Sequence, residues 1–218
     1  MDLGLNINNV HKSYDRKVAL QGCTYTFEPG GVYVLMGPNG CGKSTLLRVC
    51  ALLEPCDRGD IIYTSGKTVL PHNMDLRRRI TLVLPRIGVF NTTVFKNVSY
   101  GLVLRGMRKT TIARKVEAAL DVVGLMHKRE QPALTLSSGE SQRLGIARAM
   151  VLEPDLLFLD EPTASTDVEN TTIVEGIILA MKREAKTTVV MSTHDREQAE
   201  RLASRVVSVR DGRIIASA

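Results

Sequence analysis

Residues 37–45 read Gly-Pro-Asn-Gly-Cys-Gly-Lys-Ser-Thr, and this stretch decides the fold. It matches the pattern G-x-x-x-x-G-K-[ST], whose fixed places are taken here by two glycines, a lysine and a serine. Glycine lets successive backbone N–H groups turn inward and approach phosphate oxygens, and a helix that starts here presents the positive end of its dipole. The stretch therefore predicts a loop that binds the phosphates of a nucleotide. We expect its residues to line that nucleotide: Gly37, Pro38, Asn39, Gly40, Cys41, Gly42, Lys43, Ser44 and Thr45.

The segments on either side of this loop fit the same interpretation. Residues 31–36 are short and apolar, which predicts a buried strand, and residues 44–53 carry apolar side chains at helical spacing. Between a strand and a helix, Lys43 is placed to reach the β- and γ-phosphates, and the Ser44 hydroxyl is placed to ligate Mg²⁺. The loop alone does not distinguish kinases, GTPases and transport ATPases.

A second chemical element is a pair of carboxylates at residues 160 and 161. They follow the apolar segment 156–159, Leu-Leu-Phe-Leu, which predicts another buried strand. At the end of that strand Asp160 is placed to hold the hydration shell of Mg²⁺. Glu161 is placed to act as the general base on the attacking water, with Lys43 as the cationic partner in catalysis.

The wider pattern alternates short apolar segments with helical periodicity. Segments that predict strands are residues 31–36, 80–84, 156–159, 187–191 and 206–209, and Asp211-Gly212 predicts a hairpin turn after the last of them. Strands separated by helices indicate βαβ units and a largely parallel sheet, so we expect an α/β fold.

The middle of the chain follows a different pattern. Ile112, Val116, Leu120 and Val123 recur on one face of a helix that we expect to stop at Gly124. We interpret residues from about 86 to 153 as a helical subdomain inserted into a core formed by about 1–85 and 154–218, all within one domain.

Composition and charge exclude several other classes. Hydrophobic residues make up 44% of the 218 residues and charged residues 24%, which excludes a mainly disordered chain. Apolar runs are far shorter than the roughly 18 residues of a membrane-spanning helix, and the first ten residues indicate no secretory signal. The net charge of +6 suits any anionic partner, but the arginine triplet 77–79 is too short for a nucleic-acid patch, so we expect no nucleic acid.

The four cysteines lack the spacing of a zinc site or a disulfide framework, so we expect reduced thiols: Cys23, Cys41, Cys50 and Cys56. Cys41 lies inside the phosphate loop. We interpret it as a neutral filler, with sensitivity of the site to thiol reagents as the alternative.

Residues 136–140, Leu-Ser-Ser-Gly-Glu, open a further predicted helix. Taken alone, they favour a plain helix cap. Together with the phosphate loop and the acidic strand, in this order, they resemble the nucleotide-binding subunit of ATP-binding-cassette transporters over essentially the whole chain. The resemblance implies a P-loop NTPase core with a largely parallel sheet, an N-terminal antiparallel β subdomain and the inserted helical subdomain.

The resemblance also assigns roles to single residues. Tyr14 stands where such proteins stack an aromatic ring on adenine. Ser137 and Gly139 stand where they contact the γ-phosphate bound to a partner subunit. Asp167 closes the segment 164–167, which resembles the loop that crosses the dimer interface. His194 resembles the switch histidine that contacts the γ-phosphate and takes part in catalysis.

The partners implied by the resemblance follow from its mechanism. Two subunits form a head-to-tail homodimer that ATP closes and hydrolysis reopens. Separate transmembrane permease subunits dock around residues 85–91, and a substrate-binding protein is engaged indirectly through them. The implied place is peripheral, on the cytoplasmic face of the inner (plasma) membrane.

Two residues depart from the family pattern. Pro85 stands where the family usually has a glutamine, and proline offers no side-chain amide to Mg²⁺ or water and fixes φ. We therefore expect Mg²⁺ to be held by Ser44 and waters, with Asp160 behind them. Ser138 stands where glycine is common, which is a smaller departure.

Segments 90–102, 160–165 and 191–199 resemble tungstate-type oxyanion importers, so tungstate or molybdate is the expected cargo. Three alternatives come from other classes. A soluble cassette ATPase acting on ribosomes or DNA usually carries two cassettes or a long coiled-coil insertion. A small-molecule P-loop kinase lacks the segment 136–140 and the switch histidine. A nucleotide-gated module with weak or no hydrolysis is the alternative that Pro85 favours.

Overall fold

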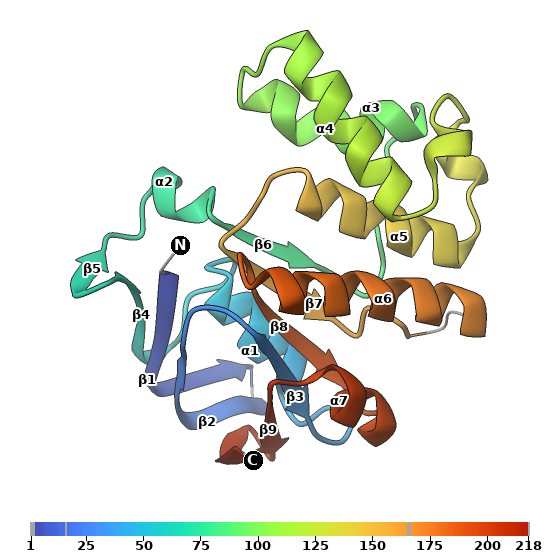
Figure 1. Cartoon of the computed structure of the whole chain (residues 1–218). Helices are drawn as coiled ribbons and strands as arrows, with labels where there is room; N and C mark the ends of the chain where they lie inside the picture. Colours follow the sequence, from blue (N-terminus) through green and yellow to red (C-terminus); the bar gives the residue numbers. More distant parts are fainter. Residues whose placement is uncertain (1–2, 16, 165–166, 218) are drawn as a thin grey trace.

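The computed structural model describes residues 3–15, 17–164 and 167–217, which form two β-sheets with helices packed on them (Figure 1). Within those residues the larger sheet has six strands in the order β10-β9-β3-β8-β7-β6. β10 runs antiparallel to β9, and the other neighbouring strands are parallel. The strands are β3 (Val32–Met36), β6 (Ile80–Val83), β7 (Leu156–Asp160), β8 (Thr188–Thr193), β9 (Arg205–Arg210) and β10 (Arg213–Ser217). The α/β fold with a largely parallel sheet is thus confirmed.

The smaller sheet is antiparallel and comes mainly from the start of the chain. Its strand order is β2-β1-β4-β5. The strands are β1 (Leu3–Tyr14), β2 (Lys17–Phe27), β4 (Arg58–Ser65) and β5 (Thr68–Leu70). This sheet is the expected N-terminal antiparallel element of the fold.

Helices cover the larger sheet and extend beyond its β6 edge. α1 (Lys43–Cys50) lies between the two sheets, and α3 (Val94–Leu104) and α4 (Lys109–Val122) lie farthest from them, above α5 (Ser138–Met150) (Figure 1). The remaining helices are α2 (Met74–Arg77), α6 (Val168–Glu184) and α7 (Arg196–Leu202), with 3₁₀ turns at Met126–Lys128 and Ala133–Thr135. Among the described residues no helix has the length and apolar character needed to cross a membrane.

Two hydrophobic cores lie on opposite faces of the larger sheet. Because side chains alternate along a strand, Val32 and Val34 of β3 belong to one core and Tyr33 and Leu35 to the other. The second core fills the space towards α1 and the antiparallel sheet. The central strand β3 therefore contributes side chains to both cores.

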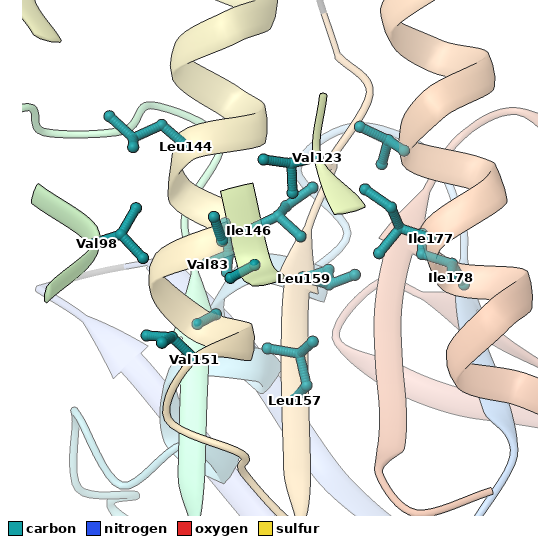
Figure 2. Close-up of a cluster of buried hydrophobic side chains, with 14 of the residues drawn as sticks. Val83, Val98, Val123, Leu144, Ile146, Val151, Leu157, Leu159, Ile177 and Ile178 are labelled. Atoms are coloured by element: carbon teal, nitrogen blue, oxygen red, sulfur yellow. The ribbon is translucent and has the colours of Figure 1, made fainter. Parts of the chain in front are cut away.

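The first core continues into the helical layer. Figure 2 shows Ile146 of α5 on the side of this helix that faces Leu157 and Leu159 of β7, and Leu144 of α5 and Val98 of α3 on its other side. All five are at most 1% exposed, and burying each such side chain contributes about 1.5–3 kcal/mol. This packing fixes α5 against the sheet and so fixes the position of its N-terminus.

Several predicted boundaries were wrong by a few residues. The helix predicted over 44–53 begins at Lys43 and ends at Cys50, because Leu52 adopts a positive φ of 58°. The strand predicted over 187–191 runs to Thr193. Residues 86–93, predicted as the start of the helical segment, contain no helix. The division of the chain at about residues 86 and 153 stays a prediction.

Candidate functional site

The glycine-rich loop joins β3 to α1 as its spacing predicts, and its shape requires glycine at two positions. A Cβ at Gly37 would lie 2.0 Å from the Val209 carbonyl oxygen. Gly42 has φ +108°, and a Cβ there would lie 2.5 Å from the Ala19 carbonyl oxygen. The loop is therefore pressed against β9 and β2 and has no room for side chains on that side.

Lys43 is folded back into this loop. Its Nζ donates to the carbonyl oxygens of Gly37 at 2.7 Å and Pro38 at 3.2 Å, and it lies 3.9 Å from Oε1 of Glu161. The residue is only 5% exposed. The ammonium is therefore held beside the backbone of the loop.

Asp160 is the buried carboxylate at the end of β7, and two hydroxyls hold it. Ser44 Oγ donates to its Oδ1 at 3.0 Å, and Ser192 Oγ donates to the same oxygen at 2.7 Å. Asp160 is 1% exposed. The second hydroxyl escaped the sequence analysis. Its only sequence signal is a serine at the end of an apolar strand, two residues before His194.

Glu161 sits between a lysine and a histidine. Its carboxylate lies 3.9 Å from Lys43 Nζ and 3.5 Å from His194 Nδ1. Its backbone has φ +46°, unusual outside glycine, and its N–H donates to Ser192 Oγ at 2.9 Å. Ser192 thus hydrogen-bonds to both acidic residues. The side chain of Glu161 lines the cleft beside the glycine-rich loop.

The donor set at Ser44 and Asp160 fits Mg²⁺. Hydroxyl and carboxylate oxygens are the ligands that this hard cation prefers, and it usually keeps several waters. Among the described residues no group of three or more His, Cys, Asp or Glu side chains forms a metal cage. A cation held by one hydroxyl, a carboxylate behind it and substrate phosphates agrees with this sparse set.

Tyr14 ends β1 at the rim of the same cleft, which has a volume of about 430 Å³ and is also lined by Asn39 and Glu161. The ring is 40% exposed, and Lys12 Nζ lies 5.6 Å from its centroid. Its hydroxyl donates to Glu54. Partial burial, and to a smaller extent this hydrogen bond, raise the pKa of Tyr14, so the phenol stays neutral. The bond to Glu54 also fixes the orientation of the ring.

Ser137, Gly139 and Asp167 lie apart from the residues that line this cleft. Ser137 caps α5 in a capping box, because its Oγ accepts from the Glu140 N–H at 3.2 Å while Glu140 accepts from the Ser137 N–H at 3.0 Å. Asp167 caps α6. In the predicted interface segment 164–167, Ser165 and Thr166 lie outside the described residues.

A third feature is an apolar groove between the sheet edge and the helical layer. It has a volume of about 610 Å³ and is lined by residues 81–84, 86–90 and parts of α3 and α5. Phe90 is 41% exposed and stacks under the Arg148 guanidinium, whose carbon lies 4.7 Å from the ring centroid. Pro85 is exposed at the end of β6, beside this groove.

The cysteines are free thiols in the structure. Burial raises the pKa of the Cys50 thiol. Cys41 belongs to the phosphate loop but is only 6% exposed. The thiol of Cys41 is therefore turned into the second hydrophobic core, away from the cleft.

Comparisons with known proteins give one consistent result. The family model described as ABC transporter matches residues 20–164. A tungstate uptake system ATP-binding protein, TupC, of Peptoclostridium acidaminophilum is 35% identical over 96% of each chain. A phosphate import ATP-binding protein, PstB 2, of Natronomonas pharaonis is 38% identical over 97% of this chain and 78% of its own. The solved structure of cbiO1 from Clostridium perfringens, part of the ABC transporter complex cbiONQ, has a TM-score of 0.87 at 28% identity, covering 100% of this chain and 88% of its own.

Proposed function

Because the chain belongs to the ABC transporter family as one of its ATP-hydrolysing, ATP-binding subunits, we propose that it powers import of an oxyanion through a nucleotide-bridged dimer. One observation carries the proposal. The Ser44 hydroxyl, the Asp160 carboxylate and the Glu161 carboxylate converge on the mouth of the glycine-rich loop, and Lys43 and His194 flank Glu161.

Within one subunit the loop binds the nucleotide phosphates through its backbone N–H groups, and Tyr14 stacks on the adenine. Lys43 exchanges its carbonyl partners for β- and γ-phosphate oxygens. Ser44 and Asp160 would hold Mg²⁺, which when bound neutralises charge on the phosphates. These contacts align the γ-phosphate with Glu161.

Glu161 performs the proton transfer. It accepts a proton from the attacking water as the water oxygen bonds to the γ-phosphorus, while the bond to the β–γ bridging oxygen breaks and ADP leaves with that electron pair. His194 donates a hydrogen bond to a γ-phosphate oxygen. Its Nδ1 lies 3.5 Å from Oε2 of Glu161, and this contact keeps the imidazole beside the general base.

The position of the remaining site residues supports the proposed dimer. Ser137, Gly139 and Asp167 do not line the cleft of their own chain, so they act on nucleotide bound to a second copy. A head-to-tail homodimer places the N-terminus of α5 of one subunit against the γ-phosphate held by the other, where the positive end of the helix dipole favours the charge. Closure then depends on ATP.

The apolar groove is the place for a permease subunit. Its exposed Leu84 and Phe90 offer apolar surface, and Arg86 and Arg148 border it with positive charge. We place the subunit peripherally on the cytoplasmic face of the inner (plasma) membrane, where the permease connects it to an external substrate-binding protein. The cargo does not touch this chain in such an arrangement.

Tungstate is the proposed cargo, with molybdate as the related oxyanion. The support is the likeness to TupC over nearly the whole of both chains. Relatives named for phosphate and for spermidine/putrescine import reach similar identity, so the proposal concerns the complex and is tested there. Reconstituted with its permease, the chain should drive tungstate uptake. Uptake of phosphate or polyamine without tungstate would overturn this assignment.

The test of the catalytic proposal is Mg²⁺-dependent ATPase activity measured across protein concentration, beside Glu161→Gln. A rate that rises more steeply than linearly and disappears in the variant supports a catalytic dimer. Binding of ATP without hydrolysis, alone and with the permease, would instead support a nucleotide-gated module. The observation that favours this second function is Pro85, which leaves the end of β6 without the usual glutamine.

A further inference from the structure

Asn170 lies in the first turn of α6 and is 8% exposed, although its side chain is polar. Each of its groups has a partner. Its Nδ2 donates to both carboxylate oxygens of Asp167, at 2.8 and 2.9 Å, and its Oδ1 accepts from Nε of Arg143 at 2.8 Å. One carboxamide therefore bridges the cap of α6 and the middle of α5.

Arg143 extends the connection to a third helix. The residue is 8% exposed, and its Nη1 donates to the carbonyl oxygen of Val123, the C-cap of α4, at 2.6 Å. A buried guanidinium is costly unless it is hydrogen-bonded, so these partners hold it in one geometry. The end of α4, the α5 helix and the start of α6 are thereby tied at one point.

The same carboxamide occupies the space beside Gly139. A Cβ at Gly139 would lie 2.4 Å from the side-chain Cγ and Nδ2 of Asn170. Real Cβ atoms do not approach so closely, and the carboxamide cannot withdraw without losing its bonds to Asp167 and Arg143. Gly139 has no positive φ, so backbone strain does not explain the glycine.

We propose that Asn170 is a positioning residue that locks the turn at Ser137–Gly139 and Asp167, the cap of α6, into one rigid unit, and that Gly139 is a glycine in order to admit the Asn170 carboxamide. The proposal rests on the proposed function only for its consequence, which is that one subunit presents this turn and Asp167 to its partner's nucleotide in fixed relation. The geometry itself concerns a single chain.

The first test needs no ligand. Hydrogen exchange on the full chain is measured at the amides of Glu140 and Ser141, which are bonded to Ser137 in the first turn of α5. Asn170→Ala should raise their exchange rates about tenfold, since it removes a charge-assisted hydrogen bond from Arg143. Thr172→Ala, an exposed change in the same helix, is the matched control and should leave them unchanged. Faster exchange confined to α6 would overturn the rigid unit.

The second test is a double-mutant cycle on thermal stability. Gly139→Ala should lower the melting temperature in the parent chain and have little effect in the Asn170→Ala chain, because the carboxamide that the new methyl group meets is gone. Equal losses in both backgrounds would overturn the packing explanation. If Gly139→Ala does not fold, its recovery as a folded protein in the double variant gives the same answer.

A third measurement separates this inference from the proposed function. Asn170→Asp keeps the shape beside Gly139 and the acceptor for Arg143 but places a carboxylate against Asp167. It should lower kcat in the dimer by about tenfold and leave MgATP affinity of the monomer within about twofold of the parent. Loss of monomer affinity would contradict a positioning role, whereas failure of the parent to bind MgATP would contradict the proposed function alone.

Discussion

The Ser44 hydroxyl lies 3.0 Å from Oδ1 of Asp160, although 116 residues separate them along the chain. The bond joins the first turn of α1 to the carboxyl end of β7. Parallel strands bring their carboxyl ends to one edge of the sheet, where ligands bind in open α/β folds. The acidic pair and the phosphate loop meet for that reason.

Glu161→Gln should reduce ATP hydrolysis by at least about 100-fold, because the amide cannot accept the proton of the attacking water. ATP binding should persist, since the loop and Lys43 are unchanged. Turnover and equilibrium binding of a fluorescent nucleotide measure the two effects. Retained turnover would show that another group is the base.

Two substitutions at Tyr14 should distinguish the contribution of its ring to ATP binding from that of its hydroxyl. Tyr14→Ala should weaken ATP binding by about 1 kcal/mol, whereas Tyr14→Phe, which keeps the ring and loses the hydroxyl that bonds to Glu54, should stay within about 0.5 kcal/mol of the parent. Calorimetric titration with ATP measures both. Equal affinity of all three chains would remove the stacking role.

Ser192→Ala should destabilise the protein by about 1–3 kcal/mol, because it takes a buried donor from Asp160 and an acceptor from the Glu161 N–H. Urea unfolding measures the free energy. Ser13→Ala, at an exposed place on β1, is the control and should change it by less than about 0.5 kcal/mol. Catalysis should fall as well, since the same hydroxyl sets the orientation of Glu161.

Low pH should lower the stability of the fold through protonation of Glu140. The hydrogen bond from Lys128, together with the Ser137 N–H, holds the pKa of this carboxyl below its ordinary value of 4.5. A lowered pKa means that the stabilisation is fully present above 4.5 and is lost as the pH falls through the lower folded value. Glu140→Gln should therefore be less stable than the parent at neutral pH, and the difference should vanish at low pH. Urea unfolding at several pH values checks this, and a constant difference would contradict it.

The groove prediction concerns the permease. Phe90→Ser should reduce co-purification with the permease and the ATPase stimulation that it causes, because exposed apolar surface at the groove is lost. Val69→Ser, which also removes an exposed apolar side chain but on β5 of the other sheet, is the control. Equal loss in both variants would mean that the groove is not the docking place.

The sequence by itself determined the chemistry that depends on short spacing. The loop 37–45, the pair Asp160–Glu161 and the alternation of apolar strands with helices are local patterns, so their residue types and order predicted an α/β fold with a nucleotide site. The ends of helices were predicted less accurately, because the backbone conformation of the residues that follow a helix determines where it stops. Leu52, in a left-handed conformation, ends the turn after α1 earlier than the apolar periodicity indicates.

Only the tertiary structure decided which side chains from distant segments meet. Ser192 reaches Asp160 because β8 lies beside β7, and Asn170 reaches Arg143 because α6 packs against α5. Periodicity shows which face of an element is buried but carries no information on the neighbour that buries it. The reason that Gly139 is a glycine lies in a residue of another helix, and that contact exists only once the shared hydrophobic core has brought the two helices together.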